Sequence, residues 1–262
     1  MLIRKKDGLF YFQFHNLSQF PKVRHGIFTR HGGCSPKPFQ SLNSSFSVGD
    51  DPVNVKRNRR SIADCFINKA HEGSMVYLKQ IHSDQVRIFK HRSESNLSER
   101  PEITMKGDAV ITELPHRYLL IQVADCQAVL FYDPVRHVVA NVHSGWRGSV
   151  KNIIGKTVSF MKQHFMSNPK DIVAGIGPSL GPCCAEFVNY RSEIPENLLK
   201  YRTRSNYFDF WTVSRDQMKS EGIPGKNIET GNLCTRCRTD LFFSFRGEQS
   251  TGRFSGVIGI LP

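Results

Sequence analysis

The sequence predicts a mixed α/β (α+β) protein in which layered mixed β-sheets carry helices on their outside. Strand-like runs outnumber helical ones and are interrupted by helices at irregular intervals, which is untypical of a regular βαβ barrel. The 262 residues are 39% hydrophobic and 11% aromatic, which is a globular composition. Neither an internal repeat nor a low-complexity linker divides the chain, so we expect residues 1–262 to form a single domain.

Three helices are predicted from capping residues and apolar periodicity. The first begins at Pro52, because proline suits the first helical position and Asp51 is a suitable N-cap. The second begins near Gly148, and the third covers residues 212–221, where Gly222 closes it. The apolar stripes of the first two helices are Val55, Ile62, Phe66 and Ile67, and Val150, Ile153, Ile154, Val158, Met161 and Phe165.

Short apolar runs between turn residues predict the strands. A polar stretch at 91–106 separates two of these runs, and we expect it to be a surface loop rather than a domain boundary. The predicted strands are residues 74–79, 108–112, 118–123, 128–132, 137–143, 171–176, 227–230, 242–245 and 255–260.

Charge and apolar content exclude several classes of protein. The net charge of +13 favours anionic partners, but the positive residues are scattered, so we expect no nucleic-acid partner. No apolar run approaches the roughly 18 residues of a membrane span, and no apolar segment follows the charged N-terminus as in a secretory signal. We therefore expect a cytoplasmic protein with no membrane partner, and the odd number of cysteines, 7, fits a reducing compartment. The sequence indicates no oligomeric state.

A glycine-rich turn, SGWRG at residues 144–148, joins the strand predicted at 137–143 to the second helix. Backbone N–H groups at a helix N-terminus attract anions, and Arg147 adds a fork of donors suited to phosphate or carboxylate. The turn is therefore a candidate anion cradle. The alternative is a tight connection that leaves Arg147 on the surface.

Four further side chains could carry chemistry. Asp125 and Cys126 interrupt two apolar runs, which predicts a buried hairpin or one long kinked strand over 118–132. If His82, Cys126 and His143 converge, they would suit zinc, with copper as the softer competitor, and leave a fourth position for water. The same residues could instead form a cysteine nucleophile with a histidine base. The sequence spacing leaves both alternatives open.

A second group of cysteines consists of the adjacent pair Cys183 and Cys184 and the CxxC of Cys234 and Cys237. Together they could bind a structural zinc ion. An adjacent pair is sterically awkward as joint ligands, and the chain has no second CxxC. The sequence therefore favours ordinary buried or surface thiols at these positions.

The motifs of this sequence resemble those of one family, the laccase-domain or YfiH family. They occur in the same order over nearly the whole chain, and HSGWRG with upstream ADC and QIH is a specific combination. One departure is that Arg246 is followed by Gly247, where the family often has a second basic residue. The matching segments are TRHGGCS at 29–35, SLN at 41–43, NR at 58–59, KQIH at 79–82, GDA at 107–109, ADC at 124–126, VHSGWRG at 142–148, GIGPS at 175–179, GPCC at 181–184, FFS at 242–244 and TGR at 251–253.

The resemblance implies both a fold and a chemistry. The fold would be YfiH-like, a single α/β domain of layered mixed sheets, with zinc bound by His82, Cys126 and His143. Family activities are phosphorolysis of adenosine, inosine and methylthioadenosine, and deamination of adenosine. An older family label is copper-dependent phenol oxidation, and some bacterial relatives are called peptidoglycan editing factors.

These activities assign roles to further residues. Phosphorolysis needs a phosphate held against the sugar while the base leaves, and deamination needs an activated water and a proton shuttle. The candidates are Gly145, Arg147, Arg59 and Arg30 for phosphate, Asn43 for the ribose or base, and Asp125 or Asp84 for the proton.

Four hypotheses for the function follow. The leading one is a zinc-dependent purine nucleoside phosphorylase with adenosine deaminase side activity, whose partners are purine nucleosides and phosphate. A copper-dependent polyphenol oxidase is the second, although the 10 histidines include no HxH pair for a copper cluster. The third is a cysteine hydrolase acting on peptidoglycan precursors, with Cys126 as nucleophile and His143 as base. A basic nucleic-acid-binding protein is the fourth, and the scattered charge disfavours it.

Overall fold

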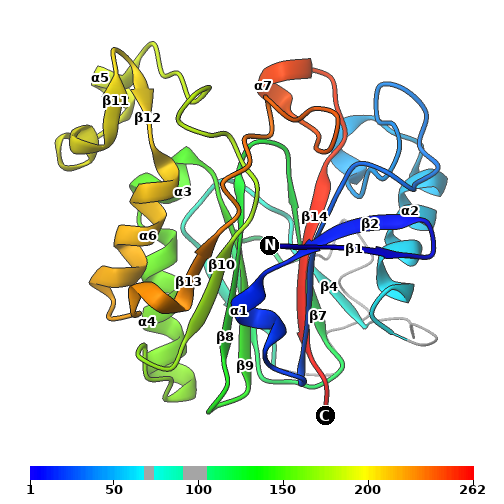
Figure 1. The fold of residues 1–262 in the computed structure, drawn as a ribbon, viewed down its shortest axis with the longest axis horizontal. Coiled ribbons are helices and arrows are strands. Elements are labelled where there is room, and N and C mark those ends of the chain that lie inside the picture. The colour runs from blue at the N-terminus through cyan, green and yellow to red at the C-terminus, as the bar shows by residue number, and fades with distance from the viewer. Residues whose placement is uncertain (68–73, 91–104) are drawn as a thin grey trace.

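Two six-stranded mixed sheets pack against each other and carry helices on their outer sides (Figure 1). The computed structural model describes residues 1–67, 74–90 and 105–262. The architecture confirms the predicted α/β class of layered mixed sheets with outer helices. No helix in these described ranges is long and apolar enough to cross a membrane.

The first sheet has the strand order β1-β2-β3-β14-β7-β4. Its pairs are antiparallel except for β4, which runs parallel to β7. Its strands are β1 (Leu2–Lys6), β2 (Leu9–Gln13), β3 (Val23–Phe28), β14 (Phe254–Ile260), β7 (Tyr118–Val123) and β4 (Met75–Tyr77).

The second sheet has the order β13-β10-β8-β9-β6-β5, with parallel pairs at both of its edges. A separate small hairpin joins β11 (Arg202–Arg204) to β12 (Tyr207–Phe208). The strands of the second sheet are β13 (Ile228–Thr230), β10 (Val173–Ile176), β8 (Gln127–Asp133), β9 (Val138–Ser144), β6 (Ala109–Thr112) and β5 (Val86–Ile88).

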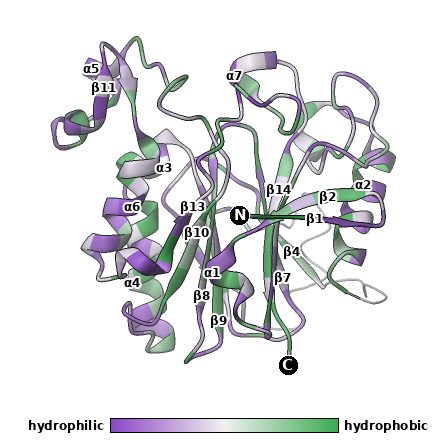
Figure 2. Ribbon diagram, viewed as in Figure 1, coloured by the Kyte–Doolittle hydropathy of each residue, from purple (hydrophilic) through white to green (hydrophobic). Residues whose placement is uncertain are grey.

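The main core lies between the two sheets, where strands of both contribute side chains such as Ile121, Leu130 and Ile258. The buried amide of Asn141 bridges the layers, since its Nδ2 donates to the carbonyl oxygens of Leu119 and Gly256, each at 2.8 Å. A buried amide needs such partners, so this contact specifies how the sheets stack. Figure 2 shows that the central strands β8 and β9 are mostly hydrophobic.

Helices cover the outer faces of both sheets. The helices α4 (Ile153–Phe165) and α6 (Phe210–Ser220) pack on the second sheet, and α2 (Pro52–Asp64) packs on the first. At the start of each of these three helices, a side-chain oxygen of the N-cap residue accepts a hydrogen bond from a backbone N–H group. The short helices are α1 (His15–Ser18), α3 (Trp146–Val150), α5 (Tyr190–Glu193) and α7 (Phe245–Glu248), and the 3₁₀ turns are Phe46–Val48, Glu196–Tyr201 and Gly225–Asn227.

All the predicted strands form except 242–245, and that prediction was wrong. Phe242 and Phe243 are fully buried in the core without strand pairing, and Ser244 caps α7 through its hydroxyl. The second predicted helix is two helices, because Asn152 adopts a left-handed φ of 56° and starts α4 afresh. The strands β1, β2, β3, β5, β11 and β12 were not predicted from the hydrophobic pattern. Most of the surface loop predicted at 91–106 lies outside the described residues.

The segment 118–132 is neither a hairpin nor one kinked strand, which corrects both expectations. β7 belongs to the first sheet and β8 to the second, and they share no strand pairing. The chain crosses between layers at Asp125, whose left-handed φ of 82° makes the sharp turn. The crossing places residues 124–126 at one end of the sandwich, where the candidate site lies.

Candidate metal centre and its cavity

Strand ends and one loop bring His82, Cys126 and His143 together, and we call this group the strand-end centre. His143 lies in β9, and Cys126 immediately precedes β8, whose Ala128 pairs with His143. The possible ligand atoms all lie within 4.8 Å of one another. The two imidazole rings stand edge to face, with centroids 4.8 Å apart. The convergence that the sequence spacing left open is therefore present.

The carboxylate of Asp108 accepts hydrogen bonds that hold both His143 and His82 in position. Its fully buried carboxylate accepts from His143 Nδ1 at 2.8 Å and from the backbone N–H of His82 at 2.9 Å. The N–H and hydroxyl of Ser83 donate to the same carboxylate at 2.6 and 2.7 Å. Because an ionised carboxylate only accepts, His143 carries its proton on Nδ1 and turns Nε2 toward Cys126.

The strand-end centre holds opposite charges in a buried setting. Burial raises the pKa of the Cys126 thiol, but His143 and His82 outweigh that effect and bring it down to about 6. Burial lowers the pKa of His143, but Cys126 and Asp108 outweigh it and raise it to about 9. The thiolate is the form of cysteine that binds metals or acts as a nucleophile.

The residues present fit a divalent metal ion. Two imidazoles and a thiolate are a zinc donor set that copper also accepts, and an acidic residue behind a histidine is the usual support for such ligands. Gly145 leaves room above the sulfur, because a Cβ there would lie 2.9 Å from Cys126 Sγ and 3.4 Å from His82 Cδ2. The charges of Cys126 and Asp108 would balance a dication.

The strand-end centre borders an open cavity of about 810 Å³. A cavity of this size accommodates a small organic ligand. Its wall combines cationic side chains with apolar and aromatic ones. Among the lining residues are Arg59, Arg147, Arg246, Arg253, Phe46, Tyr77, Trp146, Phe187, Phe210, Phe245, Gln80, Asp125 and Gly145.

Two of the predicted phosphate ligands line this cavity with their guanidinium groups on aromatic rings. Arg147 is exposed and stacks 4.4 Å from the ring of Trp146, and its guanidinium has no hydrogen-bond partner within the described ranges. Arg59 lies between Phe46 and Tyr77, at 4.3 and 4.0 Å from their ring centroids. Both guanidinium groups are held flat by these contacts, which favours binding of an anion.

Arg30 and Asn43 do not line the cavity. The fully buried Asn43 amide accepts from the backbone N–H of Arg253 at 2.9 Å and donates to Asp50 at 2.8 Å. Arg30 pairs with Glu248 at 2.8 Å and donates to two carbonyl groups of neighbouring loops. The structure places both behind the cavity wall, where they connect its loops.

Asp125 lines the cavity but already serves as an acceptor for three donors. Its Oδ1 accepts from the hydroxyls of Thr235 and Ser244 at 2.6 and 2.7 Å. Its Oδ2 accepts from the backbone N–H of Arg246 at 2.6 Å. These bonds join the segment of Asp125 to two others, the loop at Thr235 and the start of α7. Asp84, the other predicted proton carrier, forms an ion pair with a lysine of α4 and is absent from the lining.

Sequence reasoning missed two residues at the site. It assigned no role to Asp108, although the GDA motif at 107–109 contained it. It also assigned none to Arg253 in the TGR motif, a half-buried cavity residue. Burial lowers the pKa of Arg253, while Cys126 and Asp125 raise it in part. The two motifs drew attention to these residues, but only the fold shows that Asp108 contacts the strand-end centre and that Arg253 lines the cavity beside it.

Known proteins resemble this chain over most of its length. A family model described as multi-copper polyphenol oxidoreductase laccase matches residues 24–261. The chain is 31% identical over 249 residues to the purine nucleoside phosphorylase YlmD of Bacillus subtilis, covering 91% of this chain and 89% of that protein. It is 36% identical over 234 residues to a purine nucleoside phosphorylase of Clostridium acetobutylicum, covering 81% and 90%.

Solved structures match over nearly the whole length. The structure of YlmD from Geobacillus stearothermophilus superposes with a TM-score of 0.88 at 29% identity, covering 99% of this chain and 98% of that one. The structure of the hypothetical protein YfiH from Bacillus licheniformis gives 0.87 at 31% identity, covering 98% of each chain.

Proposed function

The chain belongs to the multi-copper polyphenol oxidoreductase laccase family, and from that premise we propose that it is a zinc-dependent purine nucleoside phosphorylase. Relatives named purine nucleoside phosphorylase support an enzyme of this kind. The observation that carries the proposal is the strand-end centre beside a cavity lined by arginine and aromatic side chains. The substrates would be adenosine, inosine or methylthioadenosine together with phosphate.

His82, Cys126 and His143 would hold the zinc ion. Bound there, zinc would supply Lewis-acid polarisation at one side of the cavity. Asp108 keeps the proton of His143 on Nδ1 and so keeps Nε2 available as a ligand.

The arginine residues would bind the phosphate. In the reaction a phosphate oxygen bonds to C1′ of the ribose, the bond from C1′ to the purine nitrogen breaks, and the departing base takes up a proton. Arg147 offers a fork of donors that is unpaired within the described residues, and Arg59 offers a second cation at the cavity wall on the rings of Phe46 and Tyr77. The aromatic rings of Phe187 and Phe245 provide apolar surface for a purine.

Asp125 would act as a positioning residue. Its three donors come from two segments, the loop at Thr235 and the start of α7 at Ser244 and Arg246, so it would hold these segments in place rather than move a proton. A deaminase side activity would use the same cavity for a different step: a water oxygen would bond to C6 of the adenine, the bond from C6 to the exocyclic nitrogen would break, and inosine and ammonia would result.

The test incubates zinc-loaded protein with each nucleoside, with and without phosphate, and separates the products by chromatography. Free base and ribose 1-phosphate should form only with phosphate, and Cys126→Ala should abolish both. Cys34→Ala is the matched control, since Cys34 is exposed and does not line the cavity. Absence of both products from protein with zinc bound would overturn the proposal.

One observation favours a second candidate. Cys126 as a thiolate nucleophile and His143 as its base would also suit a cysteine hydrolase of peptidoglycan precursors. Bound zinc would distinguish the two candidates. It would protect Cys126 from alkylation by iodoacetamide and would inhibit a cysteine hydrolase. Cleavage of peptidoglycan fragments by zinc-free protein would favour the hydrolase.

Copper-dependent phenol oxidation remains the third alternative. Within the described ranges the possible metal-binding groups are the strand-end centre and a cluster of four cysteines, and the latter contains no histidine. A multicopper site needs a histidine-rich cluster to collect electrons. Phenol oxidation that depends on added copper, without nucleoside cleavage, would favour this alternative.

A further inference from the structure

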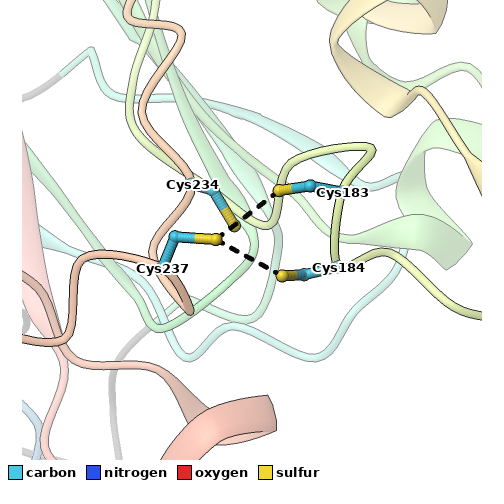
Figure 3. Close-up of side chains that lie close together, drawn as sticks. All are labelled: Cys183, Cys184, Cys234 and Cys237. Carbon is cyan, nitrogen blue, oxygen red and sulfur yellow. Dashed lines mark hydrogen bonds between the residues drawn. The ribbon is translucent and has the colours of Figure 1, made fainter.

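A second group of metal-ligating side chains lies outside the strand-end centre. Cys183 and Cys184 follow β10, and Cys234 and Cys237 follow β13. These strands are parallel neighbours, so the loops after them emerge at the same edge of the sheet. Figure 3 shows the four side chains of this four-cysteine cluster directed toward one another.

Backbone hydrogen bonds join the two cysteine-bearing loops without any bound ion. The backbone N–H of Ser179 donates to the Leu233 carbonyl at 3.2 Å, and that of Thr235 donates to the Ser179 carbonyl at 3.1 Å. Gly181 makes the close approach possible, since a Cβ there would lie 3.1 Å from Cys234 Cβ. The pairing of β10 with β13 therefore continues into the cluster and holds its two halves in register.

We propose that Cys183, Cys184, Cys234 and Cys237 bind a structural zinc ion. The four sulfur atoms lie within 4.8 Å of one another. Cys237 Sγ is 3.6 Å from Cys183 Sγ and 3.5 Å from Cys184 Sγ. Four thiolates around zinc at about 2.3 Å in a tetrahedron lie about 3.8 Å apart, so small adjustments complete the site.

The adjacent cysteines are not awkward in this fold. The backbone N–H groups of Cys184 and Ala185 both donate to the Gly181 carbonyl at 2.9 Å. This tight turn directs Cys183 and Cys184 toward the same sulfur atom of Cys237. The steric objection raised by the sequence alone is thus removed by the turn at Gly181.

Without an ion, burial and the closeness of the sulfur atoms disfavour ionisation of Cys183 and Cys184. Burial and the neighbouring thiols raise the pKa of Cys183, and they raise that of Cys184 to about 11. Burial also raises the pKa of Cys234, but backbone N–H bonds from Gly181 and Cys237 outweigh it and lower that pKa. Such N–H bonds support thiolate ligands, and a dication removes the repulsion that keeps the other thiols protonated.

Four protein ligands close the coordination shell, so the ion would be structural rather than catalytic. It would also fix one wall of the cavity. Ser179, Leu180, Ala185 and Phe187 line the cavity from the segment around Cys183 and Cys184, and Thr235, within the CxxC, donates to Asp125. The proposal stands independently of the reaction that the cavity performs.

The first experiment isolates the cluster by removing a ligand of the strand-end centre. Cys126→Ser protein is purified under reducing conditions with added zinc and then desalted. Elemental analysis should give one zinc ion per chain, and X-ray absorption should show four sulfur neighbours at about 2.3 Å. Protein without zinc, or zinc with nitrogen and oxygen neighbours only, would overturn the proposal.

A second measurement uses the wild-type chain, so it does not depend on any variant folding. Iodoacetamide labelling is followed by mass spectrometry before and after zinc chelation. Cys183 and Cys237 are exposed and should be labelled only after chelation, whereas the exposed Cys34 should be labelled in both states. Equal labelling of all three before chelation would contradict the proposal, as would disulfide-linked peptides from the reduced preparation.

A Cys237→Ser variant completes the test. It should lose one zinc ion per chain relative to wild type and melt at a lower temperature, because a bound ion stabilises the folded state by mass action. Cys34→Ser should retain the wild-type zinc content. Unchanged zinc content in Cys237→Ser would overturn the assignment of this ligand.

Discussion

The strand-end centre and the four-cysteine cluster hold their potential metal ligands on different kinds of structure. His143 and Cys126 belong to paired strands, and a buried carboxylate holds His143 from behind. The cysteines of the cluster lie on loops and three of them are at least partly exposed. The comparison shows that paired strands and a buried carboxylate hold the first group of side chains, whereas loops that follow β10 and β13 hold the second.

The largest effect should follow from removing the carboxylate that distinguishes the two sites. Asp108→Asn replaces an acceptor of several buried N–H and O–H groups with a group that also donates. We expect the free energy of unfolding to fall by about 3–5 kcal/mol, and zinc affinity of the strand-end centre to fall about 10–100-fold. Denaturant unfolding and competitive zinc titration measure these quantities.

The control for Asp108→Asn is Asp133→Asn, at the opposite end of β8. Asp133 is fully buried and accepts from the backbone N–H groups of Val135 and Arg136. This variant should lose stability but keep zinc affinity. If both variants lost zinc affinity equally, the carboxylate would act only through general stability.

A buried histidine without a carboxylate provides the next test. His25 Nε2 accepts from the backbone N–H of Phe14, and burial of the ring lowers the pKa of His25 to about 4. Because the unfolded state then binds the proton more tightly, stability is fully present above pH 6.5 and is lost as pH falls toward 4. The loss should reach about 3 kcal/mol.

Urea unfolding between these pH values measures the effect. His25→Gln keeps an acceptor for Phe14 and should remove this part of the pH dependence. His164→Gln, on the exposed side of α4, should leave it as in wild type. A His25→Gln curve that parallels the wild type would disprove the linkage.

The sequence predicted the residues that meet in the strand-end centre better than those that support them. Cys126 and His143 stand at the ends of apolar runs, which a sequence pattern reveals. Asp108 meets His143 only through the pairing of β6 with β9, in which Ala109 lies opposite Val142. Spacing along the chain contains no such information, because pairing between distant strands is set by packing of the whole sheet.

The missed and wrong elements have a similar cause. β1 is an edge strand with three charged residues, so it shows no apolar alternation. Phe242 and Phe243 form an apolar run like that of a strand, but they fill the core from an irregular segment. The four-cysteine cluster depends on the parallel pairing of β10 with β13, which spacing alone cannot reveal.

A smaller effect should follow from removing the hydrogen bond that connects the two sites. Thr235 lies within the CxxC of the cluster and donates from its hydroxyl to Asp125 beside the strand-end centre at 2.6 Å. Thr235→Val keeps the shape and removes the donor to a charged acceptor, so the free energy of unfolding should fall by about 2 kcal/mol. Thermal or urea unfolding measures it. Thr203→Val is the control, because that hydroxyl is exposed and its contact is long, 3.4 Å; an equal loss in both variants would contradict the role of Asp125 as the link.

The smallest effect concerns the space above the Cys126 sulfur. Gly145→Ala would place a Cβ 2.9 Å from Cys126 Sγ, although the backbone at Gly145 is extended and suits alanine. Without metal, the sulfur moves aside at little cost, whereas a metal-bound sulfur cannot. We therefore expect zinc affinity to fall roughly tenfold, about 1.4 kcal/mol, with the melting temperature of the metal-free protein nearly unchanged.

Competitive zinc titration and calorimetry of the metal-free protein separate these two quantities. Gly225→Ala is the control, because its Cβ would meet only Lys219 Cε at an ordinary 3.6 Å and should change neither quantity appreciably. A lower melting temperature of the metal-free Gly145→Ala protein would show that the glycine is required for packing alone. A loss of zinc affinity with an unchanged melting temperature would instead show that this glycine leaves space for the metal-bound sulfur, as Gly181 leaves space beside Cys234 in the four-cysteine cluster.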